Sequence, residues 1–202
     1  PTTLEESRFV GQMAFGQEEL LQEEKEVFYQ KWCGLIDDEK GFAILNNGTY
    51  GGSSKDGILN ISLLRTPVYS AHPIYDRQIA ETDRSLEHMD MGEREFTYRL
   101  TTDIEYLDAQ AEIYNQPVYA LSFFPSGAGE SKDTMVEITN QNLILTRYDR
   151  KANGKSCLRI YNASEMEQRG SLQIERQVYE ISMRPFEYHT YEWAQGELKK
   201  VD

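Results

Sequence analysis

Apolar and polar residues alternate along much of the chain after Val27, and this period of two is typical of strands that bury one face. The alternation is clearest in two stretches, residues 58–64 and 95–100. Its apolar positions are Leu59, Ile61 and Leu63 in the first stretch and Phe96, Tyr98 and Leu100 in the second. Each stretch therefore predicts a strand with one buried face.

A second set of predicted strands occupies the last third of the chain, with alternating apolar positions in residues 136–138, 143–145 and 158–160. Asn153-Gly154 lies between two of them and predicts a hairpin, since Asn and Gly tolerate the left-handed backbone of a tight turn. Residues 37–41, 46–48 and 55–57 carry similar turn chemistry. We predict an all-β fold, a β-sandwich of two packed units.

Three segments break the pattern. Residues 1–26 are rich in Glu and Gln, and we expect a frayed or helical lead-in there. The polar stretch Thr66–Gly92 predicts a long loop. Asn115-Gln116-Pro117 interrupts the strands, because proline cannot donate a ladder hydrogen bond. We place a domain boundary there, which divides the chain into residues 1–116 and 117–202.

The charge balance narrows the choice of partners. The 202 residues hold 21 Lys and Arg against 34 Asp and Glu, a net charge of −13. Such an acidic excess argues against binding to nucleic acid or to an anionic membrane surface. No apolar run is long enough for a bilayer and the N-terminus lacks the pattern of a signal peptide, so we expect a cytoplasmic location. Cys33 and Cys157 are expected to be free thiols.

The usual signatures of catalysis are missing from the sequence. His72, His88 and His189 stand far apart without metal-ligand spacing, and there is no nucleophile elbow or phosphate loop. The acidic residues fall in turns or in the Glu-rich segment, where solvated acids are common. We therefore expect no catalytic residue, no metal site and no cofactor in these residues. Three Asn-x-Ser/Thr sequons begin at Asn47, Asn60 and Asn162 and would matter only in a secretory pathway.

One loop does have the composition of a binding site. Residues 46–52 combine two amides, a tyrosine and three glycines directly after an apolar strand. Amides can bond to sugar hydroxyls, a tyrosine offers a ring face, and glycines let a ligand approach the backbone. An ordinary glycine-rich turn has the same composition, so both interpretations stay open.

Longer motifs carry a resemblance. The run Gly41–Gly51, GFAILNNGTYG, is followed by Asp56–Pro67, DGILNISLLRTP. Together they resemble the C-terminal β region of glycoside hydrolase family 38, the alpha-mannosidases. The likeness spans most of residues 27–191, and its further pieces are Gln30-Lys31-Trp32, Gly92–Leu100, Asn115-Gln116-Pro117, Leu158–Asn162 and Arg184–Thr190.

The resemblance implies a larger parent enzyme. Members of this family are retaining hydrolases whose zinc ion, aspartate nucleophile and acid/base carboxylate come from an N-terminal domain, which these residues do not match. The start at Pro1 also suggests a piece of a longer chain. By resemblance, residues 1–116 correspond to the later part of a galactose-mutarotase-like supersandwich and residues 117–202 to a small C-terminal β-sandwich. The implied partners are an alpha-mannoside and the N-terminal catalytic domain of the same chain.

The resemblance also implies site residues. The Asn-rich loop would reach toward the catalytic cleft of the parent enzyme, which gives Asn46, Asn47, Tyr50 and Gly51 a substrate-contact or cleft-lining role. Thr49 departs from the larger or charged residue that is usual in relatives. We expect Arg65 to hold a carboxylate or a carbonyl at the end of its strand.

The leading hypothesis is thus a non-catalytic β region that supports and partly lines an alpha-mannosidase active site. The alternatives are a stand-alone carbohydrate-binding module, the same region of a mannosylglycerate-type hydrolase, and a purely structural or homo-oligomer-forming sandwich. The sequence does not determine linkage specificity or whether phosphorylated mannosides are substrates.

Overall fold

The computed structural model describes residues 2–4, 6–66, 91–121 and 134–201. The loop predicted for residues 66–92, with His72 and His88, falls almost entirely outside these ranges.

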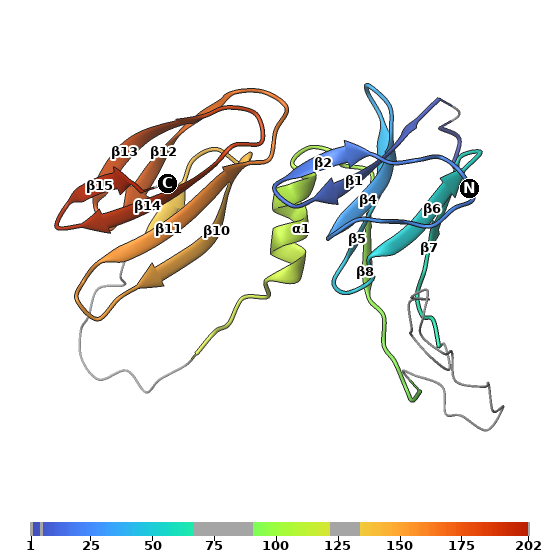
Figure 1. Cartoon of the computed structure of the whole chain (residues 1–202), viewed down its shortest axis with the longest axis horizontal. Coiled ribbons are helices and arrows are strands. Elements are labelled where there is room, and N and C mark those ends of the chain that lie inside the picture. Colours follow the sequence, from blue (N-terminus) through green and yellow to red (C-terminus); the bar gives the residue numbers. More distant parts are fainter. Residues whose placement is uncertain (1, 5, 67–90, 122–133, 202) are drawn as a thin grey trace, which may run out of the picture.

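The N-terminal residues form two antiparallel sheets that pack against each other (Figure 1). The larger has the order β2-β1-β4-β5-β8, and the smaller has the order β3-β6-β7. Phe9, Tyr29 and Leu35 are buried between them, and the partly buried Leu59 and Ile61 of the smaller sheet pack against this cluster. The strands are β1 (Arg8–Met13), β2 (Gly16–Glu19), β3 (Val27–Phe28), β4 (Trp32–Ile36), β5 (Gly41–Asn46), β6 (Gly51–Lys55), β7 (Ile58–Ile61) and β8 (Tyr98–Thr101).

The C-terminal residues form a second pair of antiparallel sheets, with the orders β10-β11-β14-β15 and β13-β12-β9. Alternate side chains such as Leu158, Ile160, Leu172 and Ile174 fill the core between them, as expected for a sandwich. The strands are β9 (Val136–Ile138), β10 (Leu143–Arg150), β11 (Ser156–Asn162), β12 (Gln168–Ile174), β13 (Gln177–Met183), β14 (Tyr188–Ala194) and β15 (Glu197–Lys200). The predicted fold class, an all-β sandwich, is confirmed.

Asn162 forms side-chain hydrogen bonds to the backbone at the end of β11, inside this second unit. Its side chain is fully buried, and Nδ2 donates to the carbonyls of Met166 (2.8 Å), Arg184 (2.9 Å) and Met183 (3.3 Å). Oδ1 accepts from the Ser164 amide at 2.9 Å. Every hydrogen-bonding atom of this amide is therefore committed to the backbone of the chain.

A single helix in the described part of the chain, α1 (Leu107–Asn115), lies between the two pairs of sheets (Figure 1). Leu107 and Ala111 pack against Trp32 and Leu45 on the face of the larger sheet that points away from the smaller one. This sheet is consequently buried on both faces. The sequence analysis did not predict the helix, and Asn115, where the strand pattern breaks, is its last residue.

The expected helical or frayed lead-in was wrong. Residues 8–19 form the β1–β2 hairpin, which turns at Phe15 with a positive φ of 60°. Phe9 is fully buried and Leu20 is 8% exposed in the core between the N-terminal sheets. Burial of these apolar side chains outweighs the helical preference of the surrounding Glu and Gln.

The predicted turns are confirmed, but neither predicted buried face is complete. Asp56 (φ 51°) and Gly57 (φ 69°) make the tight β6–β7 turn, and Gly154 (φ 82°) makes the β10–β11 turn. Leu63 lies beyond the end of β7 and is 50% exposed. Leu100 is 62% exposed. It belongs to β8 at the edge of its sheet, where none of the described residues covers it. The division at residue 116 stays a prediction.

Candidate functional site

A groove of about 410 Å³ lies beside the loop that joins β5 to β6. The loop itself, from Gly48 to Gly51, lines the groove together with the segment that follows β7. The groove is lined by Glu26, Val27, Phe28, Gly48, Thr49, Tyr50, Gly51, Ser62, Leu63, Leu64 and Arg65. Three separate parts of the sequence therefore meet there.

Asn46 fixes the start of the loop. Its side chain is 1% exposed, Nδ2 donates to the Gln30 carbonyl at 2.9 Å, and Oδ1 accepts from the amides of Gly48 (3.1 Å) and Thr49 (3.0 Å). An Asn side chain that bonds to amides two and three residues ahead imitates a turn of backbone. Asn46 thus shapes the loop from beneath, and its amide does not face the groove.

Gly51 ends the loop where space is tightest. Its carbonyl accepts from the Ser62 amide at 2.9 Å and from the Tyr29 hydroxyl at 3.3 Å. A Cβ at this position would lie 2.6 Å from Glu26 Oε1, which is closer than Cβ atoms approach. Glycine lets the Glu26 carboxylate lie against the loop, and a larger residue would displace that side chain.

Glu26 and Arg65 form an ion pair across the groove. The guanidinium side chain is 73% exposed and the carboxylate side chain 32%, so the pair lies at the groove's surface, where such pairs add little stability. The expectation that Arg65 holds a carboxylate is confirmed. The Glu26 carboxylate gives the groove a hydrogen-bond acceptor, and the Arg65 guanidinium gives it several N–H donors. The two charges nearly cancel.

Exposed apolar side chains flank this ion pair. Phe28 is 72% exposed, Tyr50 59%, Leu63 50% and Leu64 47%. The Thr49 hydroxyl is shielded from solvent and finds no hydrogen-bond partner among the described residues. Aromatic faces beside a few fixed polar groups are typical of sites for neutral, hydroxyl-rich ligands.

The groove lacks the pair of carboxylates that glycoside hydrolysis requires. Glu26 is the one carboxylate among its described lining residues, and it is already paired with Arg65. General acid catalysis together with a nucleophile or base needs two such groups about 5–10 Å apart. The described lining of the groove therefore supplies one of the two carboxylates that this reaction uses.

Two of the four predicted site residues line the groove and two do not. Tyr50 and Gly51 line the groove, whereas Asn46 is buried below it. Asn47 is exposed at the tip of the turn and is not part of the described lining. The role of all four as substrate contacts stays a prediction.

Histidine and metal chemistry find little support in the described ranges. His189 is 7% exposed, its Nδ1 lies 2.9 Å from the Tyr191 hydroxyl, and its Nε2 lies 3.2 Å from Glu187. No group of three His, Cys, Asp or Glu side chains gathers anywhere in the described residues. Cys33 and Cys157 are both free thiols. No helix in the same ranges is both long and apolar enough to cross a membrane.

The groove lies in the part of the chain that matches a known protein family. The family described as "Glycosyl hydrolases family 38 C-terminal domain" matches residues 15–73, which include every described residue that lines the groove. This part of the chain is similar to a family 38 C-terminal domain. The resemblance that the motifs carried is confirmed.

Two known proteins are similar to parts of this chain or to its fold. Over 75 residues, which are 37% of this chain and 6% of the relative, the chain is 36% identical to "Alpha-mannosidase 2C1" of Mus musculus. The crystal structure of an alpha-mannosidase from Enterococcus faecalis V583 superposes with a TM-score of 0.69 at 16% identity. That superposition covers 93% of this chain but 24% of the other, so the chain spans about a quarter of that alpha-mannosidase.

Sequence reasoning missed part of the groove. Glu26 belongs to an acidic run that we interpreted as a solvated face, and Phe28 stands in a two-residue strand too short to show a period. Neither residue carries a local signal of its role. Their contacts with the loop depend on the pairing of β3 with β6, which joins residues 27–28 to 51–52.

Proposed function

We propose that this chain is the non-catalytic C-terminal β region of an alpha-mannosidase, which supports and partly lines the active site of its parent enzyme. The observation that carries this proposal is the position of the groove, because all of its described lining lies within the family 38 match. Tyr50 and Phe28 would pack against the sugar rings. The Glu26–Arg65 pair would bind hydroxyl groups from the side.

The catalytic groups and the zinc ion of this proposal come from the N-terminal catalytic domain of the parent polypeptide. The described residues do not fit a zinc site, since the one described histidine, His189, already faces Tyr191 and Glu187. Mannose metabolism in the cytoplasm and an alpha-mannoside substrate complete the proposal.

The decisive experiment uses the parent enzyme with Tyr50→Ala. Loss of one aromatic contact should lower kcat/KM for an aryl alpha-mannoside about threefold to tenfold. Tyr119→Ala is the matched control, because Tyr119 is 89% exposed and lies outside the groove. Equal kcat/KM values for the wild type and a folded Tyr50→Ala enzyme would refute the lining role.

The purified 202-residue chain tests the non-catalytic part of the proposal. We expect no cleavage of alpha-mannosides. Cleavage that follows the monomer peak in size-exclusion chromatography would overturn it. An immunoblot of the source cells adds a further check, since a parent enzyme requires a band several times larger than 23.4 kDa.

The exposed aromatic side chains favour a second candidate, a carbohydrate-binding module. Phe28 and Tyr50 both line the groove and are largely exposed to solvent. A band near 23.4 kDa, together with saturable binding of mannosides by the isolated chain, would favour this candidate. A flat titration across a panel of sugars would remove it.

A further inference from the structure

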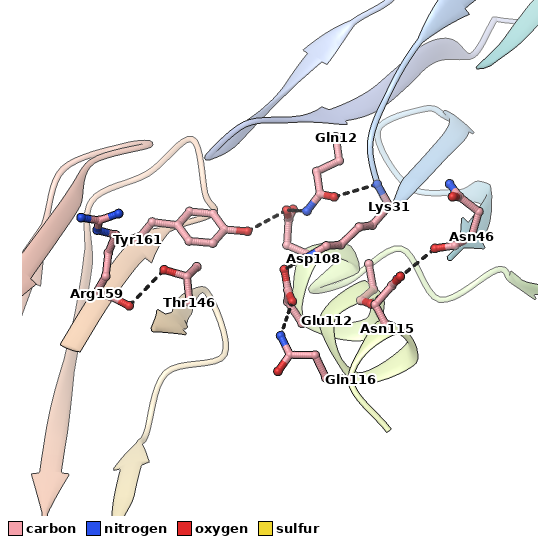
Figure 2. Close-up of polar contacts among 11 residues, drawn as sticks. Gln12, Lys31, Asn46, Asp108, Glu112, Asn115, Gln116, Thr146, Arg159 and Tyr161 are labelled. Carbon is pink, nitrogen blue, oxygen red and sulfur yellow. Dashed lines mark hydrogen bonds and ion pairs between the residues drawn. The ribbon is translucent and has the colours of Figure 1, made fainter. Parts of the chain in front are cut away.

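Helix α1 bears a stripe of polar side chains that faces the protein and not the solvent. Asp108, Glu112 and Asn115 are spaced i, i+4 and i+7, which places them on one side of a helix. Asp108 is 5% exposed, the Glu112 side chain 15%, and Asn115 is half-buried. Buried polar groups need partners, and Figure 2 shows that each of the three reaches a different strand or strand end.

Asp108 joins the two β units at the first turn of α1. Its Oδ1 accepts a hydrogen bond from Gln12 Nε2 of β1 at 2.5 Å and another from the Tyr161 hydroxyl of β11 at 3.1 Å (Figure 2). Burial raises the pKa of the Asp108 carboxyl, and the hydrogen bonds from Gln12 and Tyr161 act in the opposite direction. The Tyr161 hydroxyl is therefore one of the groups that make a buried carboxylate tolerable.

Aromatic packing holds the Tyr161 ring in place. The ring is 3% exposed and meets the edge of Phe15, from the β1–β2 turn, with centroids 5.5 Å apart. Phe15 stacks in turn on Tyr188 of β14 at 5.2 Å. The C-terminal sandwich thus contacts both the β1–β2 hairpin and helix α1 of the N-terminal unit.

The lower part of the stripe reaches the candidate loop. Glu112 forms an ion pair with Lys31. The backbone carbonyl of Lys31 accepts a hydrogen bond from the backbone N–H of Asn46 at 2.8 Å. Asn115 Nδ2 donates to the Asn46 carbonyl at 2.9 Å (Figure 2). Asn46 is the residue that shapes the loop from beneath. A continuous set of contacts therefore runs from Tyr161 to the wall of the groove.

We propose that α1 couples the C-terminal sandwich to the Asn46–Gly51 loop, with Tyr161 as a positioning residue for that loop. The functional meaning of the coupling rests on the proposed function, in which the loop lines a sugar site. Tyr161 touches no ligand in this scheme. It holds Asp108, the helix holds Asn115, and Asn115 holds the backbone of Asn46.

The test is amide hydrogen exchange by NMR in the 202-residue chain, read at Gly48 and Thr49, whose N–H groups bond to Asn46 Oδ1. Tyr161→Phe removes one hydroxyl and should speed exchange at both amides about threefold. Tyr179→Phe is the matched control. It removes a hydroxyl that bonds to Gly196 and Trp193 within the C-terminal sandwich, and it should leave both amides unchanged.

A second variant keeps the test valid if Tyr161→Phe unfolds. Asn115→Ala removes the last contact of the stripe and leaves the Tyr161–Asp108 bond intact, so it should produce the same acceleration. Ile113→Ala, on the exposed side of α1, is its control. Unchanged exchange at Gly48 and Thr49 in a folded Tyr161→Phe or Asn115→Ala chain would overturn the coupling.

This measurement needs no sugar, so it separates the two proposals. Faster exchange with normal kcat/KM for the Tyr50→Ala parent enzyme would retain the coupling and refute the lining role. Normal exchange with impaired Tyr50→Ala turnover would do the reverse.

Discussion

Replacing Asn46 with Ala should destabilise the chain by about 1–3 kcal/mol, even though Asn46 stands in a loop predicted to bind a ligand. The structure sets this magnitude. The change removes hydrogen bonds to the Gln30 carbonyl, the Gly48 amide and the Thr49 amide. Gln30 and Gly48 are exposed residues that can bond to water instead. Thr49 is half-buried, and a buried group left without a partner costs about 1–3 kcal/mol.

The assay is urea unfolding followed by circular dichroism and tryptophan fluorescence together, so that separate unfolding of one β unit is detected. Asn47→Ala is the matched control, because it removes the same side chain one position later on the exposed surface, where changes stay within about 0.5 kcal/mol. Asn46→Asp should also be destabilising, because it keeps the acceptor but replaces the donor to Gln30 with a buried charge. Equal midpoints for Asn46→Ala and Asn47→Ala would refute the scaffold role.

Three further predictions concern the two β units separately. Burial raises the pKa of the Cys33 thiol to about 12. A thiol reagent should therefore leave Cys33 unmodified in the folded chain and modify it only in denaturant. Fast modification of Cys33 together with Cys157 would contradict its burial. Bonds from Arg184 lower the pKa of Glu187 from 4.5 to about 2, so its stabilising effect is complete above pH 4.5 and is lost as the pH falls toward 2. Glu187→Gln should therefore flatten the dependence of urea midpoints on pH in that window, and an unchanged slope would contradict this reading. Gly34→Ala should lower the free energy of unfolding in urea by about 1–3 kcal/mol, because the alanine Cβ would lie 2.7 Å from a backbone oxygen of β5. An unchanged midpoint would show that the sheet can shift to make room.

The sequence predicts local features of this fold better than distant contacts. Period-two patterns and turn residues identified β7, β11 and the β10–β11 hairpin, because each depends on neighbours in the chain. Helix α1 was missed because its N-cap residue, Tyr106, has a left-handed backbone and makes no side-chain cap hydrogen bond, so the usual start signal is absent. Its polar positions face the protein, which hides the amphipathic pattern as well.

The candidate site was predicted only in part for a similar reason. Amides, a tyrosine and glycines in one heptapeptide drew attention to the loop, and Tyr50 and Gly51 do line a groove. Composition alone could not show that Asn46 bonds inward or that the Glu26 carboxylate lies against the loop. Nor could it join Tyr161 to Asp108, which are 53 positions apart and belong to different β units.

The buried amide of Asn162 has a practical consequence for protein production. Asn162-Ala163-Ser164 is an acceptor sequence for N-linked glycans, and a glycan would be attached at the Nδ2 that donates to three backbone carbonyls. A glycan would replace one of the two Nδ2 hydrogens and would need room for a sugar at a fully buried atom. Modification of the nascent polypeptide in a secretory host would therefore prevent the native packing at the end of β11. A glycan on exposed Asn47 would instead leave the fold intact and cover the rim of the groove. Bacterial cytoplasmic expression, or Ser164→Ala and Thr49→Val in a eukaryotic host, avoids both outcomes.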